Sequence, residues 1–195
     1  MLSKNKTKFI QSLNRKKNRD AHMFFIAEGE KIIRELLHAD FRMHSIIGIE
    51  STLSQFSKAE CILEEASMQE MEKISAFKSP PSAIAICHQR KSKIDFERIS
   101  HELSIVLDDI QDPGNLGTII RLASWFGIKN IICSMHSADC YNPKTIQASM
   151  GAIAHVDIHY TSIDDFLLRP SIQAIDRYGT FLEGENIYTT ELNPS

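Results

Sequence analysis

The sequence has no apolar run long enough to cross a membrane, and its basic, polar N-terminus lacks the apolar stretch of a secretion signal. Its 4 cysteines form neither a CxxC pair nor the Cys/His spacing typical of a zinc site. We therefore expect reduced thiols, a cytoplasmic location, no membrane contact and no bound metal. A formal net charge of −3 argues against coating nucleic acid with the whole surface, so such binding needs a local basic patch.

One basic patch lies at the N-terminus, where no acidic residue precedes Asp20. Phe9, Ile10 and Leu13 have the spacing of a narrow apolar stripe on a short helix. Two interpretations stay open for residues 1–20: a solvated surface helix, or an arm that contacts phosphate groups. The cations that would make those contacts are Arg15, Lys16, Lys17 and Arg19.

Apolar runs and helical spacings alternate along the rest of the chain and divide it into two units joined by a linker at residues 90–100. In the first unit, residues 21–89, the expected strands are 23–27, 45–49, 61–63 and 83–87. The expected helices are 28–39, 51–56 and a third one, which opens with a capping-box pattern at Ser67 and Glu70 and ends near residue 76.

The second unit, residues 101–195, alternates strand and helix more regularly. Its expected strands are 104–107, 130–133, 156–159 and 172–175, and the expected helices between or beside them are 115–126, 143–150 and 163–168. Strict alternation of strands and helices predicts a parallel α/β sheet. Because four parallel strands are few for an open α/β sheet, we expect the fold of this unit to be incomplete within the 195 residues.

Residues 103–127 are the strongest candidate for a functional site. An apolar run ends there at Asp108 and Asp109, an Asp-Pro-Gly-Asn turn follows at 112–115, and a mostly apolar helix then carries a single cation, Arg121. Ligands of open α/β sheets bind at such strand-to-helix turns. The sequence therefore predicts a ligand site around this turn.

The turn and its helix allow structural interpretations beside the functional one. Asn115 is suited to capping the helix, and Gly117 leaves space for a group to approach Arg121. A guanidinium on an apolar helix needs a partner if it is buried. That partner is either Asp108 or Asp109 at the strand end, or a phosphate or oxyanion of a substrate.

Two other kinds of site have weaker support. Gly114 and Gly117 after a strand are typical of a dinucleotide-binding turn, with Asp139 as the acid that would bind a ribose, but the third glycine of that motif is missing. The histidines at 136, 155 and 159 do not have the spacing of a common metal site. We expect these histidines to be ordinary surface or core residues.

Several short motifs occur together along the chain. The first consists of Asp112, Pro113, Asn115, Gly117, Arg121, Ala123, Phe126 and Gly127. The second is Tyr-Asn-Pro-Lys at 141–144 with Ala-Ser-Met-Gly-Ala at 148–152, and a third is Phe-Ile-Ala-Glu-Gly at 25–29. Together they resemble the SpoU/TrmH-type RNA methyltransferases of the knotted SPOUT class, the third being similar to that family's substrate-binding domain. The resemblance covers essentially the whole chain.

The resemblance implies an α/β fold in two parts: a small N-terminal RNA-binding domain of ribosomal-protein-like fold, and a C-terminal parallel-sheet domain of the SPOUT knot type, truncated before the knot. It also implies that a homodimer transfers a methyl group from S-adenosyl-L-methionine to a ribose 2′-hydroxyl of tRNA or rRNA.

The catalytic asparagine and arginine of the family correspond to Asn115 and Arg121. Because a guanidinium is a poor base, we expect Arg121 to hold the neighbouring phosphate and stabilise the developing oxyanion, and Asn115 to orient the loop. The second motif adds Lys144 and Ser149 as expected RNA contacts, although Lys144 is equally suited to a solvated helix start.

The chain departs from the family in two later motifs, a Gly-x-Glu-x-x-Gly segment and a Ser-Leu-Asn-Val-like segment. In the family these form the knot, most of the cofactor pocket and much of the dimer contact. Neither occurs here, and Phe-Leu-Glu-Gly-Glu-Asn at 181–186 is similar to the segment that precedes the first of them. We therefore expect this chain to bind the cofactor poorly and to be inactive by itself, and we assign no cofactor-binding residue. The alternative function is a non-catalytic RNA-binding module on the same scaffold.

Overall fold

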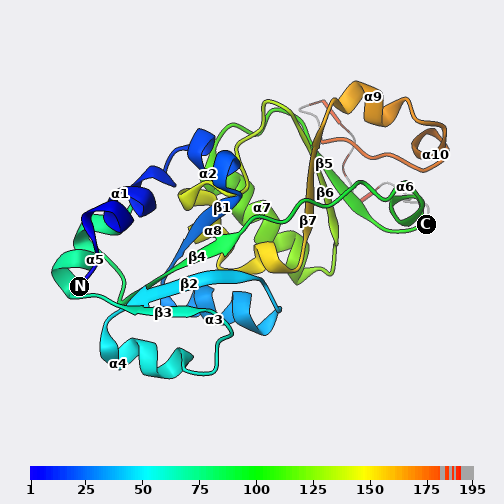
Figure 1. The fold of residues 1–195 in the computed structure, drawn as a ribbon. Helices are drawn as coiled ribbons and strands as arrows, with labels where there is room; N and C mark the ends of the chain where they lie inside the picture. Colours follow the sequence, from blue (N-terminus) through cyan, green and yellow to red (C-terminus); the bar gives the residue numbers. More distant parts are fainter. Residues whose placement is uncertain (181–182, 185, 187, 190–195) are drawn as a thin grey trace.

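The computed structural model describes residues 1–180, 183–184, 186 and 188–189. Two sheets lie side by side, with helices packed between and around them (Figure 1). The 181–186 segment, which is similar to the one preceding the later family motifs, lies partly outside the described residues. No helix within the described part of the chain is both long and apolar enough to cross a membrane.

The N-terminal unit is built on a four-stranded mixed sheet with the order β1-β4-β2-β3. Strand β4 pairs antiparallel with both β1 and β2, whereas β2 and β3 pair parallel. All four expected strands are confirmed to within a few residues, as β1 (Phe24–Glu28), β2 (Met43–Gly48), β3 (Ile62–Glu65) and β4 (Ala83–His88). The helices of this unit are α3 (Glu30–His38), α4 (Glu50–Leu53), the 3-10 turn η1 (Ser54–Phe56) and α5 (Met68–Ile74).

The expected capping box at the start of α5 is confirmed. The Ser67 hydroxyl accepts a hydrogen bond from the Glu70 backbone N–H, and the Glu70 carboxylate accepts one from the Ser67 backbone N–H. These two contacts satisfy donors that the first turn of a helix would otherwise leave free.

The basic N-terminal segment forms two helices, α1 (Lys4–Ser12) and α2 (Lys16–His22), rather than one. Ile10 and Leu13 are fully buried in an apolar cluster with Ile26 of β1 and Met71 of α5. The apolar stripe of this segment therefore docks it on the sheet, so that it is a packed part of the unit rather than a free arm.

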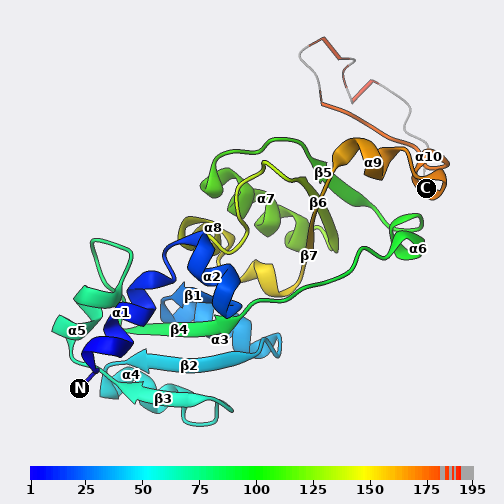
Figure 2. The ribbon, with the colours of Figure 1, turned by 45° about the horizontal axis from the view of Figure 1, so that its top comes forward.

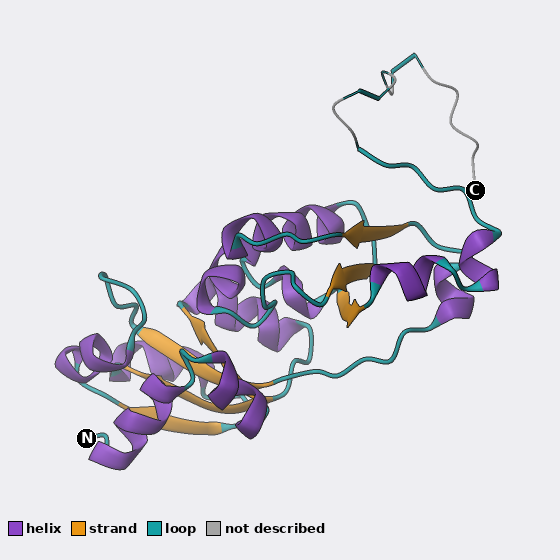
Figure 3. Ribbon diagram, turned by 90° about the horizontal axis from the view of Figure 1, so that it is seen from above, coloured by secondary structure: helices purple, strands orange, loops and turns teal. Residues whose placement is uncertain are grey.

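The second unit has a parallel sheet whose described strands are β5 (Ser104–Leu107), β6 (Asn130–Ser134) and β7 (Asp157–Thr161), in that order. Its helices are α6 (Phe96–Ile99), α7 (Pro113–Trp125), α8 (Pro143–Ser149), the 3-10 turn η2 (Ala152–Ala154), α9 (Ile163–Leu167) and α10 (Pro170–Gln173). The linker runs as an extended segment along one side of the molecule (Figure 3), and only its last part forms α6.

The prediction of a fourth strand at 172–175 is wrong, because Ile172 and Gln173 belong to helix α10. Pro170 occupies the first turn of that helix, where its fixed φ angle is favourable. Ile172 is buried beside Phe166, Ile99 and Ile132. A short apolar run is too short to show whether its periodicity is that of a strand or of a helical turn. In the structure this run forms a helical turn that packs against α6 and α9.

Helices α7 and α8 pack against each other between the two sheets (Figure 2). One continuous apolar core includes Phe25 and Leu36 of the N-terminal unit together with Leu116, Ile120 and Ile146 of the second unit. The two units are thus joined by a shared core and not only by the linker.

Gly117 permits the close approach of α7 and α8. A Cβ atom at this position would lie 2.6 Å from the Ala148 Cβ and 2.6 Å from the Thr145 carbonyl oxygen. Gly117 is itself buried, so it does not leave space beside Arg121 for a substrate, which corrects the expectation for this residue.

We expect Gly117→Ala to lower the free energy of unfolding by about 1–3 kcal/mol, because the added methyl group would overpack the contact between the two helices. Chemical denaturation with circular dichroism measures this change. Thr118→Ala, one position along the same helix and exposed, is the control and should stay within about 0.5 kcal/mol of the parent. Equal stability of the two variants would contradict the packing role of Gly117.

Candidate functional site

The turn that precedes α7 is held by hydrogen bonds to neighbouring segments. The Asp109 backbone N–H donates to the Ser134 hydroxyl at 2.8 Å, and the Ile110 N–H donates to the Ser137 hydroxyl at 3.3 Å. Asp109 has a φ angle of 53°, a left-handed conformation that aspartate tolerates better than most residues. The carboxyl end of β5 is therefore tied to the loop that follows β6, which fixes the position at which α7 begins.

Asp112, and not Asn115, caps α7. The Asp112 carboxylate accepts a hydrogen bond from the Asn115 backbone N–H at 2.8 Å, and Pro113 occupies the first turn. The expectation that Asn115 caps the helix is therefore wrong. An aspartate directly before a proline at a helix start is the signal that could have identified the cap. Asn115 itself is exposed, so its side-chain amide faces solvent.

Arg121 is exposed and, within the described residues, forms no ion pair. The alternative in which Arg121 pairs with Asp108 or Asp109 is wrong, because both carboxylates are exposed on the preceding turn and neither contacts the guanidinium. Helix α7 buries Leu116, Gly117, Ile120 and Ala123 on one face and leaves Arg121 outside, so the guanidinium needs no partner within the protein.

Asn115, Thr118 and Arg121 follow one another at intervals of three residues, and all three are exposed. Residues three apart are neighbours on a helix surface, so Asn115, Thr118 and Arg121 form an exposed strip that runs obliquely along α7. Arginine stays protonated in proteins and presents a planar fork of donors. The strip can therefore bind a phosphate or stabilise an oxyanion, but Arg121 cannot take up a proton.

Most residues of the second motif have structural roles. Tyr141 stacks on Phe25 with ring centroids 4.7 Å apart, its hydroxyl group accepts a hydrogen bond from the Arg90 backbone N–H, and burial raises its pKa. Asn142 caps α8 by accepting a hydrogen bond from the Lys144 N–H at 2.9 Å. Gly151 has a φ angle of 90°, and a Cβ there would meet Glu35 of α3.

Two further residues of this motif were expected to contact RNA. Ser149 is fully buried, and its hydroxyl group donates to the Ile146 carbonyl in its own helix. This position corrects the expectation that Ser149 contacts RNA. Lys144 is exposed in the first turn of α8, which is compatible with an RNA contact and equally with a solvated helix start.

Arg19 is not available to RNA either. Its side chain is 2% exposed and lies 2.5 Å from the carboxylate of Asp139, on the loop that leads to α8. The same guanidinium donates to the carbonyl oxygens of Leu13 and Asn14 at 2.9 Å each. Because the Asp139 carboxylate is paired with Arg19, it is not available to bind a ribose, and the dinucleotide-site interpretation of Asp139 is also wrong. No spacing pattern in the sequence connects these two residues.

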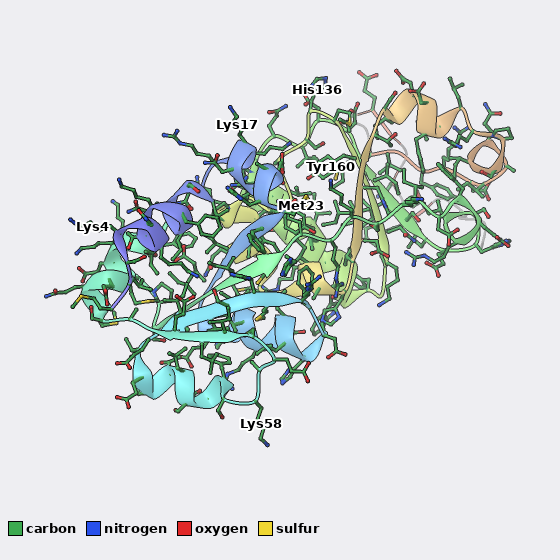
Figure 4. The ribbon with its side chains drawn as sticks, in the orientation of Figure 1. Lys4, Lys17, Met23, Lys58, His136 and Tyr160 are labelled. Carbon is green, nitrogen blue, oxygen red and sulfur yellow. The ribbon has the colours of Figure 1, made fainter. Side chains whose placement is uncertain are left out.

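The remaining cations expected to contact RNA are Arg15, Lys16 and Lys17, and all three are exposed. Figure 4 shows the Lys17 side chain pointing away from the molecule at the outer side of α2. Since the segment is docked through its apolar stripe and through Arg19, these three cations project from a fixed support.

A cofactor would need an enclosed site near α7. A cavity of about 400 Å³ lies between the two units, and the residues that line it include Lys16, Arg90, Asp139 and His159. Burial lowers the pKa of His159. No residue of α7 lines this cavity, and none lines two further cavities beside α3. The exposed strip on α7 can bind a phosphate, and none of these three cavities opens onto it. No group of His, Cys, Asp or Glu residues suited to a metal occurs within the described ranges.

We expect Asp139→Ala to lower the free energy of unfolding by about 3–5 kcal/mol, because the substitution leaves the Arg19 guanidinium buried without its counter-charge. Thermal unfolding compared with denaturant titration measures the loss. Lys17→Ala removes an exposed cation of the same helix and should be nearly neutral in stability. If Asp139→Ala is as stable as Lys17→Ala, the Arg19–Asp139 pair does not fasten the N-terminal helices.

Comparison with known proteins adds to this geometry. Residues 102–195 match the SpoU rRNA Methylase family, and residues 4–85 match the MRM3-like substrate binding domain. The chain is similar to a putative RNA methyltransferase of the TrmH family from Porphyromonas gingivalis, with 33% identity and a TM-score of 0.85 over 99% of this chain and 76% of that one.

Two other relatives are more distant. The 23S rRNA (guanosine(2553)-2′-O)-methyltransferase RlmP of Bacillus subtilis is 26% identical over 91% of this chain and 71% of its own length. An AdoMet-bound rRNA methyltransferase from Sinorhizobium meliloti is 27% identical, with a TM-score of 0.75 over 89% of this chain and 67% of that one. The resemblance found in the sequence motifs is confirmed: the chain belongs to the SpoU/TrmH family of RNA methyltransferases.

Proposed function

We propose that the protein that carries this sequence transfers a methyl group from S-adenosylmethionine to a ribose 2′-hydroxyl of RNA, with ribosomal RNA as the favoured substrate class. The observation that carries this proposal is the exposed strip of Asn115 and Arg121 on α7, in a chain of the SpoU/TrmH family. Relatives named as rRNA 2′-O-methyltransferases support the acceptor.

In this proposal Arg121 binds the phosphate next to the target ribose and stabilises the oxyanion that forms as the 2′-hydroxyl loses its proton. Asn115 does not orient the turn, because Asp112 caps α7. The exposed Asn115 amide is instead free to donate to the ribose-phosphate from the same strip of α7. The proton leaves to a group other than Arg121, since a guanidinium does not accept one.

S-adenosylmethionine, when bound, supplies an electrophilic methyl group. Its use is supported by relatives crystallised with AdoMet. This chain's own residues contribute the RNA-facing side of the reaction, and the proposal assigns none of the described side chains to the cofactor.

We also propose the finer features of the architecture and assembly. The N-terminal unit is a ribosomal-protein-like RNA-binding domain, supported by the match of residues 4–85, and the C-terminal unit is of the knotted SPOUT class. RNA contacts are assigned to Arg15, Lys16, Lys17 and Lys144, which are all exposed cations. The four unpaired cysteines support a cytoplasmic location.

A homodimer is supported by the end of α7. Leu122, Trp125 and Phe126 are 51%, 83% and 72% exposed. An exposed apolar cluster of this kind marks a surface that is covered in the functional assembly. It continues directly from the strip that carries Arg121, so the proposed dimer contact and the proposed RNA contact use successive turns of one helix.

Arg121→Lys and Arg121→Ala are both expected to lower methyl transfer by about a thousandfold, because an ammonium group lacks the planar fork that a phosphate and an oxyanion require. The measurement is incorporation of labelled methyl groups into ribosomal RNA by the protein that carries this sequence. Arg34→Lys is the matched control and should retain activity, because Arg34 is a half-exposed arginine that pairs with Glu30 and lies outside the proposed site. Full activity of Arg121→Lys would contradict the role of the fork, and RNA binding without any methyl transfer by the parent would favour the non-catalytic alternative.

Residues 1–195 alone are expected to bind S-adenosylmethionine weakly, since the sequence contains neither of the two later motifs that form most of the cofactor pocket in the family. Titration calorimetry with the 195-residue chain measures the affinity, with S-adenosylhomocysteine as a second ligand. Tight binding of either ligand would show that the described residues do form a cofactor site.

A further inference from the structure

Aromatic and imidazole rings gather at one end of the N-terminal sheet. Phe24 begins β1, His44 lies near the start of β2, and His88 ends β4. The Phe24 ring centroid lies 4.9 Å from that of His44 and 4.7 Å from that of His88, and the two imidazoles are 6.2 Å apart. Phe9 of α1 and His22 of α2 border this group, and their ring centroids are 5.1 Å apart.

The strand pairing explains why Phe24 and His88 share a face, and His44 lies at the register irregularity of β2 between Met43 and Ser45. Phe24 and His88 are direct partners in the antiparallel pair of β1 and β4. Further along the same face, Ile26 and Ile86 are buried beneath the N-terminal helices, whereas Phe24, His44 and His88 are only half-buried. The helices therefore cover one end of the face and leave the ring-bearing end partly open to solvent.

The surroundings of the rings are basic. The His88 backbone N–H donates to the Arg42 carbonyl oxygen at 3.0 Å, which places the exposed Arg42 beside the rings. Burial lowers the pKa of His88, and the positive charge of Arg42 lowers it further. His22 lies on α2, the helix that also carries Lys16 and Lys17.

Partly exposed rings beside cations suit unpaired nucleic acid better than a duplex. Unstacked bases of single-stranded RNA stack on aromatic and imidazole rings, and neighbouring cations hold the phosphates. Aliphatic side chains would pack against this end of the core equally well. Packing alone therefore does not explain why three half-buried rings, two of them imidazoles, lie here.

We infer that Phe24, His44 and His88 form a stacking platform for an unpaired base of the RNA substrate, with Arg42 and the lysines of α2 binding the flanking phosphates. This inference rests on the proposed function and identifies the form in which the N-terminal unit takes its RNA: a loop, bulge or single strand. Sequence differences between bases matter little on such a platform, because every base presents a π face.

The test measures binding of a short single-stranded RNA that carries one 2-aminopurine, using fluorescence anisotropy over a series of salt concentrations. His44→Ala is expected to weaken binding by about 5- to 100-fold without changing the salt slope, because stacking releases no counterions. His44→Phe keeps a ring and should bind like the parent. His101→Ala, an exposed histidine of the second unit, is the matched control.

The lysines give a second, opposite signature. Lys16→Gln with Lys17→Gln should reduce the salt slope by about 0.7 for each phosphate that the protein no longer neutralises, while the fluorescence change of the 2-aminopurine on binding remains. That fluorescence change in the parent protein reports stacking directly, so it decides the question even if His44→Ala lowers the melting temperature.

Three results would overturn the platform: parent-like affinity of His44→Ala, an equal loss in His44→Phe, or no fluorescence change of the 2-aminopurine on binding to the parent. If one of these results is found but RNA binding depends on salt and methyl transfer depends on Arg121, the platform fails and the proposed function still holds. Absence of RNA binding by the parent at low salt would overturn the proposed function and the platform together.

Discussion

The contact between α7 and α8 at Gly117 is the constraint on which the arrangement of the site depends. Because Gly117 has no side chain, the Thr145 carbonyl oxygen and Ala148 approach the backbone of α7 closely. That approach directs Leu116 and Ile120 into the shared core and leaves Asn115, Thr118 and Arg121 on the outside. The exposure of the two motif residues is thus a consequence of how tightly the opposite face is packed.

Polar groups buried between the elements determine how the N-terminal helices are attached. Arg19 brings the end of α2 to Asp139, and the other oxygen of that carboxylate accepts a hydrogen bond from the Tyr141 N–H at 3.0 Å. Glu28 is buried at the end of β1, where it accepts hydrogen bonds from the Ser75 hydroxyl and the Ala76 N–H, and burial raises its pKa. Each of these charges is fully partnered, as burial requires.

Local signals predicted most elements but not the partners of individual side chains. Short apolar runs identified the described strands of both units, and Ser67 with Glu70 identified the start of α5, because both patterns depend on neighbours in the sequence. The 172–175 segment failed as a strand, since its four residues carry too little periodicity to separate strand from helix.

The errors at the site have a common physical origin. The alternative in which Arg121 pairs with Asp108 or Asp109 came from the apolar composition of α7, but composition does not reveal which face of a helix a neighbouring helix covers. The burial of Arg19 and Ser149 likewise depends on contacts with residues far away in the sequence or on the packing of α8. Asn115 and Arg121 were found through motifs, and the structure adds their common exposure to solvent.

Docking of the N-terminal helices has a consequence for RNA binding that a free basic arm would not have. A flexible arm loses conformational entropy when it binds, at about 0.5–1.5 kcal/mol for each side chain that becomes ordered, in addition to the cost of ordering its backbone. Here Ile10, Leu13 and Arg19 order the backbone of α1 and α2 during folding, before RNA arrives. Arg19 binds the loop that leads to α8, and α8 packs on α7, so Lys16 and Lys17 are held at a defined position relative to Arg121. In the proposed function, a phosphate bound by Lys16 and Lys17 would therefore restrict where the ribose of the same RNA lies, and this would help Asn115 and Arg121 to select one 2′-hydroxyl.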